Sequence, residues 1–261
     1  MSEVPTFETL RLTRQGRRLT VALNRPDVLN AVNTRLHQEL IDAFAFAARD
    51  AGSDLVLLTG EGRAFSAGGD LEQMERVIAD PALFDIEVRD AKLLIFALLE
   101  IEKPVIARVN GHAVGLGCTL ALFCDVVFAA ESARIGDPHV AVGLVAGDGG
   151  AVIWPQLVGF ARAKELLMTG ELLSATRAEA IGLINHAVKD AELDARVDAF
   201  CDRLLSGATE AIRWTKVTVN LELKRLAHAL LDPGLAYESL SVRTLAHRDR
   251  VAALRARKDR A

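Results

Sequence analysis

The sequence predicts an α/β protein made of parallel βαβ units followed by a helical segment. Short apolar runs typical of buried strands alternate with stretches whose apolar residues recur at helical spacing. After about residue 190 the strand-like runs stop and only helical patterns remain. These two observations define the fold class, and each element can be justified in chain order.

The N-terminal part predicts a hairpin and a first helix. Residues 7–14 and 18–24 alternate apolar and polar side chains around Gln15-Gly16-Arg17, a pattern typical of two paired strands. Asn33-Thr34 then precedes Leu36, Leu40 and Phe44, which keep helical spacing. Asparagine is a good N-cap, so we expect the helix to begin there.

The middle of the chain predicts three further strands, at 55–59, 105–109 and 125–130. We expect a short helix from Leu71, a long one over 83–101 after the Asp80-Pro81 break, and a short one over 117–123. The C-terminal part predicts helices over 191–205, 209–231 and 235–257, with Asp232-Pro233-Gly234 separating the last two.

Two glycine-rich segments each join an apolar strand to a helix. They are Ala67-Gly68-Gly69-Asp70-Leu71, after strand 55–59, and Gly115-Leu116-Gly117-Cys118-Thr119, after strand 105–109. Glycine allows backbone to approach a ligand closely, and the first N–H groups of a helix have no intrahelical acceptor. A tight turn alone would explain one such glycine pair. Two of them predict a pair of N–H donors for a developing oxyanion.

The composition argues against several classes of function. The 261 residues are 51% apolar and carry a net charge of −4, which gives no electrostatic basis for nucleic-acid binding. No apolar run approaches the ~20 residues of a membrane span, and the first residues do not resemble a secretory signal. The three cysteines, Cys118, Cys124 and Cys201, lie in apolar patterns without metal-ligand spacing. We therefore expect reduced, buried thiols in a cytoplasmic protein.

Several segments in the same order resemble the crotonase superfamily, which contains the enoyl-CoA hydratases and isomerases. Besides both glycine segments, they are Leu23-Asn24-Arg25-Pro26, Ala133-Arg134-Ile135-Gly136-Asp137-Pro138, Gly147-Asp148-Gly149-Gly150 and Ala180-Ile181-Gly182-Leu183-Ile184-Asn185. The resemblance implies a spiral of ββα units over 1–195 and a helical oligomerisation module over 196–261. It also implies homotrimers or dimers of trimers, and acyl-CoA substrates, with coenzyme A part of the substrate and no tightly bound cofactor or metal.

By similarity, the oxyanion N–H groups belong to Gly69 and Leu116. The resemblance also places Arg25 and the backbones of Ala64 and Ala67 at the CoA moiety, and Asp70 and Thr119 near the substrate. Asp70 has a structural interpretation as a helix N-cap, and Thr119 has one as a local hydrogen-bond donor in the first turn of a helix.

The departures from the family pattern concern the acid/base. Hydratases carry catalytic glutamates where this chain has Thr119 and His139. A hydroxyl cannot replace a carboxylate base near neutral pH, whereas imidazole can. His139 is therefore the predicted acid/base, with Asp148 as its orienting carboxylate. A lone histidine is more often structural, and Asp148 has a competing role as a cap of helix 151–158.

Neighbouring side chains are expected to be structural. Asp137 is closer in sequence to His139, but we expect the intervening Pro138 to make the chain extended and to point the two side chains apart. His37 and His247 lie in helical patterns without chemical neighbours in the sequence.

The sequence therefore predicts an enoyl-CoA hydratase-like lyase that stabilises a thioester enolate. Two alternatives remain open. One is a β-diketone hydrolase that cleaves a carbon–carbon bond in a retro-Claisen reaction. The branch that carries it resembles this chain in its histidine–aspartate pair, but has a further histidine near the position of Leu116. The other is a crotonase scaffold that binds acyl-CoA without chemistry.

Overall fold

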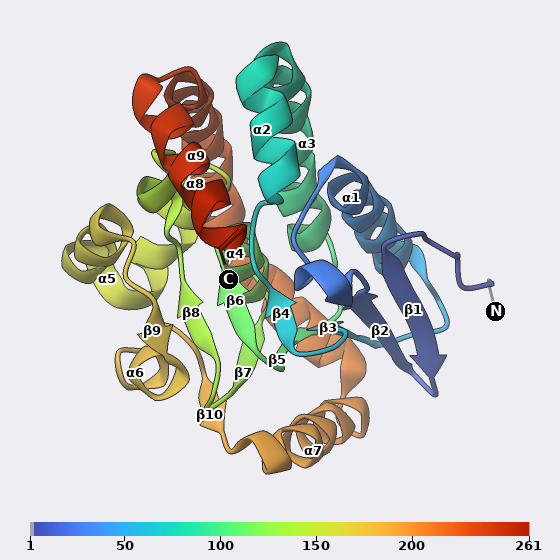
Figure 1. Cartoon of the computed structure of the whole chain (residues 1–261). Coiled ribbons are helices and arrows are strands. Elements are labelled where there is room, and N and C mark those ends of the chain that lie inside the picture. The colour runs from blue at the N-terminus through green and yellow to red at the C-terminus, as the bar shows by residue number, and fades with distance from the viewer. Residues whose placement is uncertain (1–2, 261) are drawn as a thin grey trace.

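The strands of the chain alternate between two sheets, as the computed structural model of residues 3–260 shows (Figure 1). The larger sheet has the order β1-β2-β3-β5-β7-β10 and the smaller one β4-β6-β8-β9. The larger sheet consists of β1 (Leu10–Gln15), β2 (Arg18–Leu23), β3 (Leu55–Gly60), β5 (Val105–Val109), β7 (Val126–Ala130) and β10 (His186–Val188). Only the β1–β2 hairpin is antiparallel in this sheet, with Gln15 opposite Arg18.

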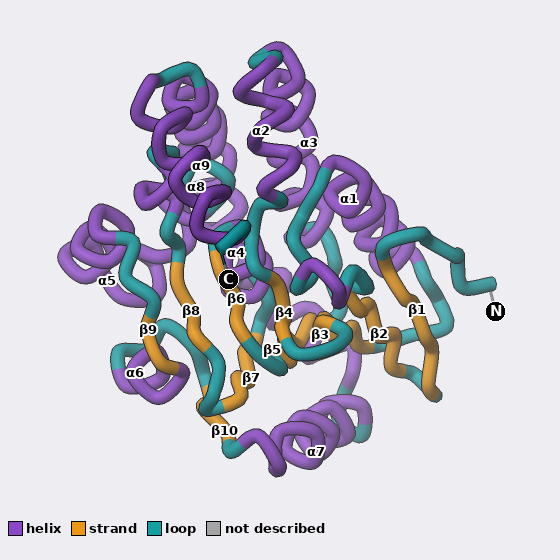
Figure 2. The backbone as a smooth tube through the Cα atoms, viewed as in Figure 1, coloured by secondary structure: helices purple, strands orange, loops and turns teal. Residues whose placement is uncertain are grey.

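Each long parallel strand is followed by a short strand of the second sheet. These short strands are β4 (Ala64–Ser66), β6 (His112–Val114) and β8 (Arg134–Gly136), and β9 (Leu173–Ser174) closes the edge. In each of the consecutive pairs β3–β4, β5–β6 and β7–β8, the first strand therefore belongs to the larger sheet and the second strand to the smaller sheet (Figure 2). This is the expected ββα spiral. The periodicity alone did not reveal the short strands, because two or three residues are too few to show alternation.

Helices connect the spiral turns and cover its faces (Figure 1). They are η1 (Pro26–Val28), α1 (Thr34–Arg49), α2 (Leu71–Ala79), α3 (Ala82–Leu99), α4 (Leu116–Leu122), η2 (His139–Val142), α5 (Gly150–Thr169), α6 (Ala175–Ala180), η3 (Asp190–Glu192), α7 (Leu193–Leu205), α8 (Thr209–Val242) and α9 (Leu245–Lys258). The predicted caps form: Asn33 accepts a hydrogen bond from the Leu36 N–H, and Asp70 accepts from the N–H groups of Glu72 and Gln73.

The predicted break at Asp232-Pro233-Gly234 is wrong. Helix α8 continues through Pro233 to Val242, and the chain turns only before Leu245. The glycine has a packing reason instead. An added Cβ at Gly234 would lie 3.0 Å from the Gly147 carbonyl oxygen, so a residue without a side chain lets α8 lie against the loop before α5.

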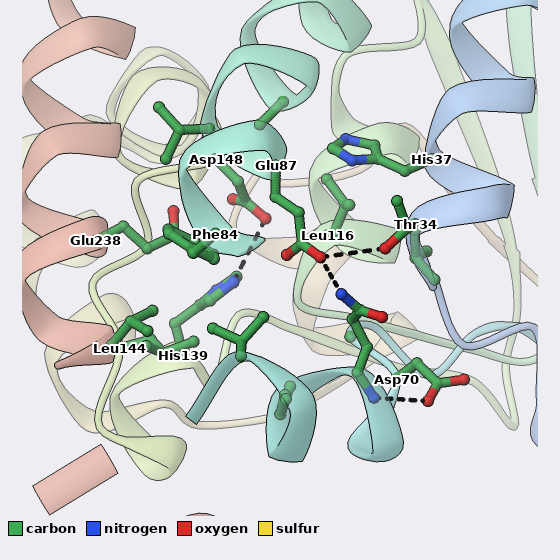
Figure 3. A pocket seen from close by; sticks show the side chains of 18 of the residues that line it. Thr34, His37, Asp70, Phe84, Glu87, Leu116, His139, Leu144, Asp148 and Glu238 are labelled. Carbon is green, nitrogen blue, oxygen red and sulfur yellow. Dashed lines mark hydrogen bonds and ion pairs between the residues drawn. The ribbon is translucent and has the colours of Figure 1, made fainter. Parts of the chain in front are cut away.

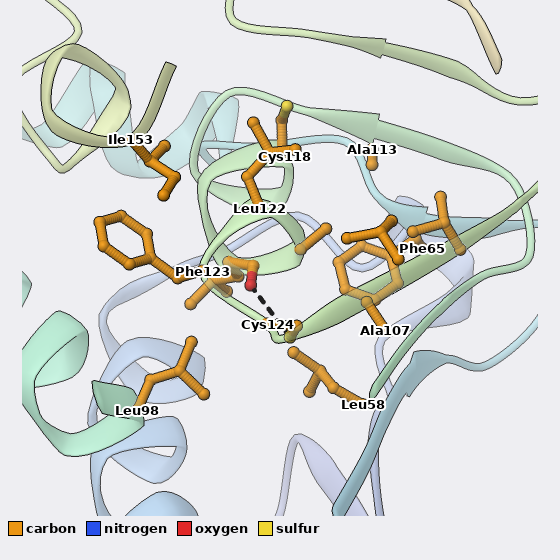
Figure 4. Close-up of a cluster of buried hydrophobic side chains, with 14 of the residues drawn as sticks. Leu58, Phe65, Leu98, Ala107, Ala113, Cys118, Leu122, Phe123, Cys124 and Ile153 are labelled. Carbon is orange, nitrogen blue, oxygen red and sulfur yellow. Dashed lines mark hydrogen bonds between the residues drawn. The ribbon is translucent and has the colours of Figure 1, made fainter. Parts of the chain in front are cut away.

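The core is aliphatic, as the composition predicted, and is continuous through the spiral. All six residues of β3 are buried, which is typical of a central parallel strand covered on both faces. Helix α4 is also almost entirely buried, and its residues Cys118 and Leu122 belong to the same buried cluster as Phe65 of β4 (Figure 4). The three cysteines are free and buried. None of the helices in residues 3–260 combines the length and apolarity needed to cross a membrane.

The C-terminal helices return to the spiral rather than standing apart from it. Helix α8 packs on α3 and α5, and α9 packs on α2 and η2. Arg255 of α9 forms an ion pair with Glu75 of α2. As a result, the end of α8 and the start of α9 line the same cavity as the two glycine turns.

Asn30 holds the segment before the first glycine turn in place. Its fully buried side chain accepts from the Arg25 N–H at 2.8 Å and donates to the carbonyl oxygens of Glu61 and Ala64 at 2.9 and 2.8 Å. Its φ of 55° is left-handed, a conformation that asparagine tolerates better than most residues.

We predict that Asn30→Ala lowers the free energy of unfolding by about 3 kcal/mol, because it leaves buried backbone groups without partners and strains the backbone. Urea denaturation measures this change. Thr13→Ala, at an exposed position of β1, is the control and should change stability by less than about 0.5 kcal/mol. Equal stability of the Asn30 variant and the wild type would contradict the assigned role.

Candidate active site

A cavity of about 110 Å³ lies between the glycine turns, helices α2 and α3, and the C-terminal helices (Figure 3). One part of its wall is apolar and is formed by Val77, Phe84, Val88, Leu144, Leu235 and Val242. Ionisable side chains, among them His139, Asp148 and Glu238, line another part of the wall. The cavity therefore combines a partly enclosed apolar space with groups that can bind or transfer protons.

The two glycine turns meet at this cavity. Gly69 and Leu116 both line it, and a Cβ at Gly68 would lie 2.7 Å from the Val114 carbonyl oxygen. Gly115, whose φ is 54°, brings the second turn close to the first. Among residues 3–260, the Gly69 and Leu116 N–H groups have no hydrogen-bond acceptor. Two unused N–H donors thus border one enclosed space.

His139 lies beside the second turn. A Cβ at Gly115 would be 3.7 Å from His139 Cε1. The ring stands between two carboxylates: Nδ1 contacts Asp137 Oδ1 at short range, and Nε2 lies 3.4 Å from Asp148 Oδ2 (Figure 3). The second contact brings together the predicted histidine and aspartate. Asp148 is further held by Thr119, whose hydroxyl lies 3.4 Å from Oδ1.

The two carboxylates decide the charge of the ring. Burial disfavours the imidazolium, but Asp137 and Asp148 outweigh it and raise the pKa of His139 well above its usual value. Burial acts against ionised Asp148 as well, and the charge and hydrogen bond of His139 outweigh it and lower the pKa of this carboxyl. His139 is therefore an imidazolium at neutral pH.

The expectation that Pro138 separates Asp137 from His139 is wrong. Pro138 has φ −89° and ψ 32°, so the chain turns here instead of extending. The turn lets Asp137 Oδ1 accept from the His139 N–H at 3.3 Å as well as contact the ring. Its other oxygen lies against Gly150 at the start of α5, where the helix dipole favours a negative charge.

Glu238 of α8 is a site residue that the sequence reasoning missed. It is 5% exposed, lines the cavity, and has one oxygen, Oε2, that is buried without a hydrogen-bond partner. Burial, with a further contribution from Asp148, raises the pKa of this carboxyl well above its usual value. It is thus a neutral acid beside a charged histidine. Glu238 belongs to no local sequence motif that would identify it as a site residue, because it lies 90 residues from Asp148 in the sequence.

Two histidines without sequence neighbours also line the cavity. Burial lowers the pKa of His37 to about 4, so its ring is neutral. His247 donates from Nδ1 to the Val142 carbonyl at 2.6 Å, and burial lowers its pKa too. Their positions depend on α1 and α9 packing over the spiral, which helical periodicity does not specify.

The remaining predicted residues lie around the first turn or behind the cavity. Asp70 lines the cavity, caps α2 and forms an ion pair with Arg25 at 2.9 Å. Arg25, Ala64 and Ala67 do not line the cavity. Thr119 is fully buried and lies behind Asp148, so it neither faces the cavity nor bonds locally as expected, because its hydroxyl is directed to Asp148.

The cluster has a composition that could also suit a metal ion. Single ligand atoms of Asp137, His139 and Asp148 lie within 4.8 Å of one another. However, the carboxylates contact opposite nitrogens of one ring, so the ring itself fills the space between them. A charged imidazolium held by two carboxylates accounts for this arrangement more directly than a cation does.

Two backbone N–H donors and an ionisable histidine on one partly apolar cavity are groups that can stabilise negative charge and transfer a proton. Comparison with known proteins gives the family. The chain belongs to the enoyl-CoA hydratase/isomerase family, whose sequence profile matches residues 15–238.

Similar proteins agree with this assignment. The chain is 37% identical over 219 residues to a crotonyl-CoA hydratase of Syntrophomonas wolfei, covering 82% of each protein. An enoyl-CoA hydratase/isomerase structure from Mycobacterium paratuberculosis superposes with a TM-score of 0.90 at 39% identity, over 95% of this chain and 99% of that one. A β-diketone hydrolase structure from Anabaena, bound to (S)-3-oxocyclohexyl acetic acid, superposes with a TM-score of 0.84 at 31% identity, over 91% and 95%.

The contact between the two turns yields a prediction. Gly68→Ala places a Cβ 2.7 Å from the Val114 carbonyl oxygen at a φ of 86°, so the turns must separate and the Gly69 N–H must move. We expect turnover to fall by about 100-fold, the usual effect of losing one oxyanion donor.

The matched control is Gly16→Ala in the β1–β2 turn. Its φ of 57° carries similar backbone strain, but no atom lies within 4 Å of the added Cβ. This variant should be less stable and fully active. Steady-state kinetics separates the two, and full activity of the Gly68 variant would show that the contact does not position the donor.

Proposed function

We propose that the protein processes an acyl-CoA thioester through an enolate, in an enoyl-CoA hydratase-like reaction. The observation that carries this proposal is the pair of unused N–H groups, of Gly69 and Leu116, on the same cavity as the charged His139. Enoyl-CoA hydratases among its relatives support the substrate class. His139 and its aspartates would take the place of the usual glutamates.

The charges in the cavity suit this chemistry. As the thioester becomes an enolate, negative charge grows on its oxygen, where the two N–H groups can donate to it. The nearby imidazolium adds a positive charge in an enclosed site, where electrostatic interactions are stronger than in water. Losing one N–H donor raises such a barrier by about 3 kcal/mol, so the paired donors would be the main catalytic device.

Hydration needs one proton removed and one added. In our proposal, water attacks the β-carbon of the enoyl group and loses a proton to Asp148, while the His139 Nε2 proton passes to the α-carbon of the enolate. The proton on Asp148 then returns to His139 across the 3.4 Å contact, which restores the resting charges. Asp137, which contacts Nδ1, holds the ring in position throughout.

A second candidate is a β-diketone hydrolase. The similarity to the Anabaena enzyme favours it. In this chain, His139 could serve as the proton donor for this reaction too. Water would lose a proton to Asp148 as it adds to one carbonyl carbon, and the bond to the central carbon would then break to give a carboxylic acid and an enolate. The enolate would take its proton from His139, and the proton on Asp148 would return to His139. Assays of crotonyl-CoA hydration and of cyclic β-diketone cleavage decide between the two, and absence of both activities would favour a binding scaffold.

We predict that His139→Ala lowers turnover by about 100-fold or more, because the proton donor is lost. His186→Ala is the control, since His186 packs against Phe128 outside the cavity, and it should be fully active. Asp148→Asn should also slow turnover with little change in substrate binding. Undiminished turnover in the His139 variant would refute the proposed acid.

The charge of His139 sets the pH dependence. Because its pKa is raised, the ring stays protonated through neutral pH and loses its proton only on the alkaline side. We expect kcat/KM to be level around neutral pH and to fall as pH rises through that pKa. Asp148→Asn removes one of the charges that raise the pKa, so the fall should begin at lower pH. Activity that increases over this range would mean that neutral imidazole is the working form.

A further inference from the structure

Three polar side chains form a second cluster on the cavity wall, separate from His139. Glu87 of α3 accepts at Oε1 from the Thr34 hydroxyl at 3.3 Å and from the Gln73 side-chain amide. All three residues line the cavity, and Figure 3 shows the Glu87 carboxyl projecting into it between the Asp148 side and α1. The mechanism proposed above uses none of them.

The cluster has unused hydrogen-bonding capacity. Among the described residues, the bonds to Glu87 involve Oε1 only, which leaves Oε2 open. Burial raises the pKa of Glu87, which favours a protonated carboxyl that can both donate and accept. His37 lies on the same side, 7% exposed, and its Nε2 is buried without a partner. Buried polar atoms are normally paired, so the His37 Nε2 atom points to a missing polar group, and the open Glu87 Oε2 atom on the same cavity wall offers it a second partner.

A purely structural role explains only part of this arrangement. Thr34, Gln73 and Glu87 come from α1, α2 and α3, so their bonds tie three helices together. That role needs Oε1 alone. A hydrocarbon chain filling the cavity would remove Glu87 Oε2 from water and leave His37 Nε2 without a partner, which is unfavourable.

The charges around the cluster limit what the polar group can be. The lining residues in the described part of the chain include no lysine or arginine, while Asp70, Asp148, Glu87 and Glu238 are all acidic. The imidazolium of His139 is already paired with Asp137 and Asp148, so a carboxylate on the substrate would find no unpaired cation among these lining residues. A hydroxyl or ketone oxygen is neutral and can pair with both open groups.

We propose that Glu87, Thr34 and His37 bind a neutral oxygen function, a hydroxyl or a ketone, on the acyl chain of the substrate. This inference rests on the proposed acyl-CoA function and narrows it. The substrate class would be oxygenated acyl thioesters, in preference to plain hydrocarbon acyl groups and to acyl groups that end in a carboxylate.

The test measures binding of saturated thioesters, which have no double bond to hydrate, by isothermal titration calorimetry. Hexanoyl-CoA, ω-hydroxyhexanoyl-CoA and adipoyl-CoA have the same length and differ at the end of the chain. A four-carbon set, butanoyl-CoA, ω-hydroxybutanoyl-CoA and succinyl-CoA, covers a shorter reach. In at least one set, we expect the hydroxyl compound to bind wild-type protein about tenfold more tightly than the hydrocarbon, and the carboxylate to bind most weakly.

Substitutions test which residues cause the preference for the hydroxyl thioesters. Glu87→Leu should abolish it, and Thr34→Val should reduce it with less risk to folding. Glu87→Gln keeps a donor and an acceptor and should retain it. Arg89→Gln is the matched control on α3, because the Arg89 side chain is 79% exposed, and it should match the wild type. Thermal unfolding verifies that each variant is folded.

The outcomes separate the two proposals. Equal binding of hydroxyl and hydrocarbon thioesters in both sets would overturn this inference and leave the acyl-CoA function intact. A preference that persists in both Glu87→Leu and Thr34→Val would also overturn it. If wild-type protein binds none of the thioesters, the acyl-CoA function fails and this inference fails with it.

Discussion

The site depends on the contact between two strand-to-helix turns that lie far apart in the sequence. Gly68 and Val114 touch backbone to backbone, which only a residue without a side chain permits at that position. The contact arises because β4 and β6 are neighbours in the second sheet, while β3 and β5 are neighbours in the first. The spiral therefore brings successive helix starts to one point, and their free N–H groups face a common space.

Burial of charge is the second constraint. His139 lies between two carboxylates in a buried region, and its ring takes a proton that burial alone would remove. Glu238 also keeps its proton, but this leaves it neutral, because burial and the charge of Asp148 disfavour a further negative charge. One region of the cavity thus holds a protonated, charged histidine and a protonated, neutral glutamate side by side.

Local chemistry explains what could be predicted from the sequence. Asn33 and Asp70 cap helices through bonds that span two or three residues, and the glycine turns and the buried strand at β3 are equally local. Glu238 and Glu87 could not be predicted, because the packing of α8 and α3 alone brings them to the cavity. The prediction that Asp137 points away from His139 was wrong because Pro138 adopts a turn conformation that its sequence context does not require.

The path of α8 has a consequence for how the protein matures. Its last turns and the start of α9 supply Leu235, Glu238, Val242 and His247 to the cavity wall, although the glycine turns lie in the first half of the chain. A nascent chain with the spiral already folded would still have an open, wet groove where the site will be. The low-dielectric surroundings of His139 therefore arise only when α8 and α9 dock, so a chain cut before residue 235 would fold the glycine turns without the wall that shields them from water.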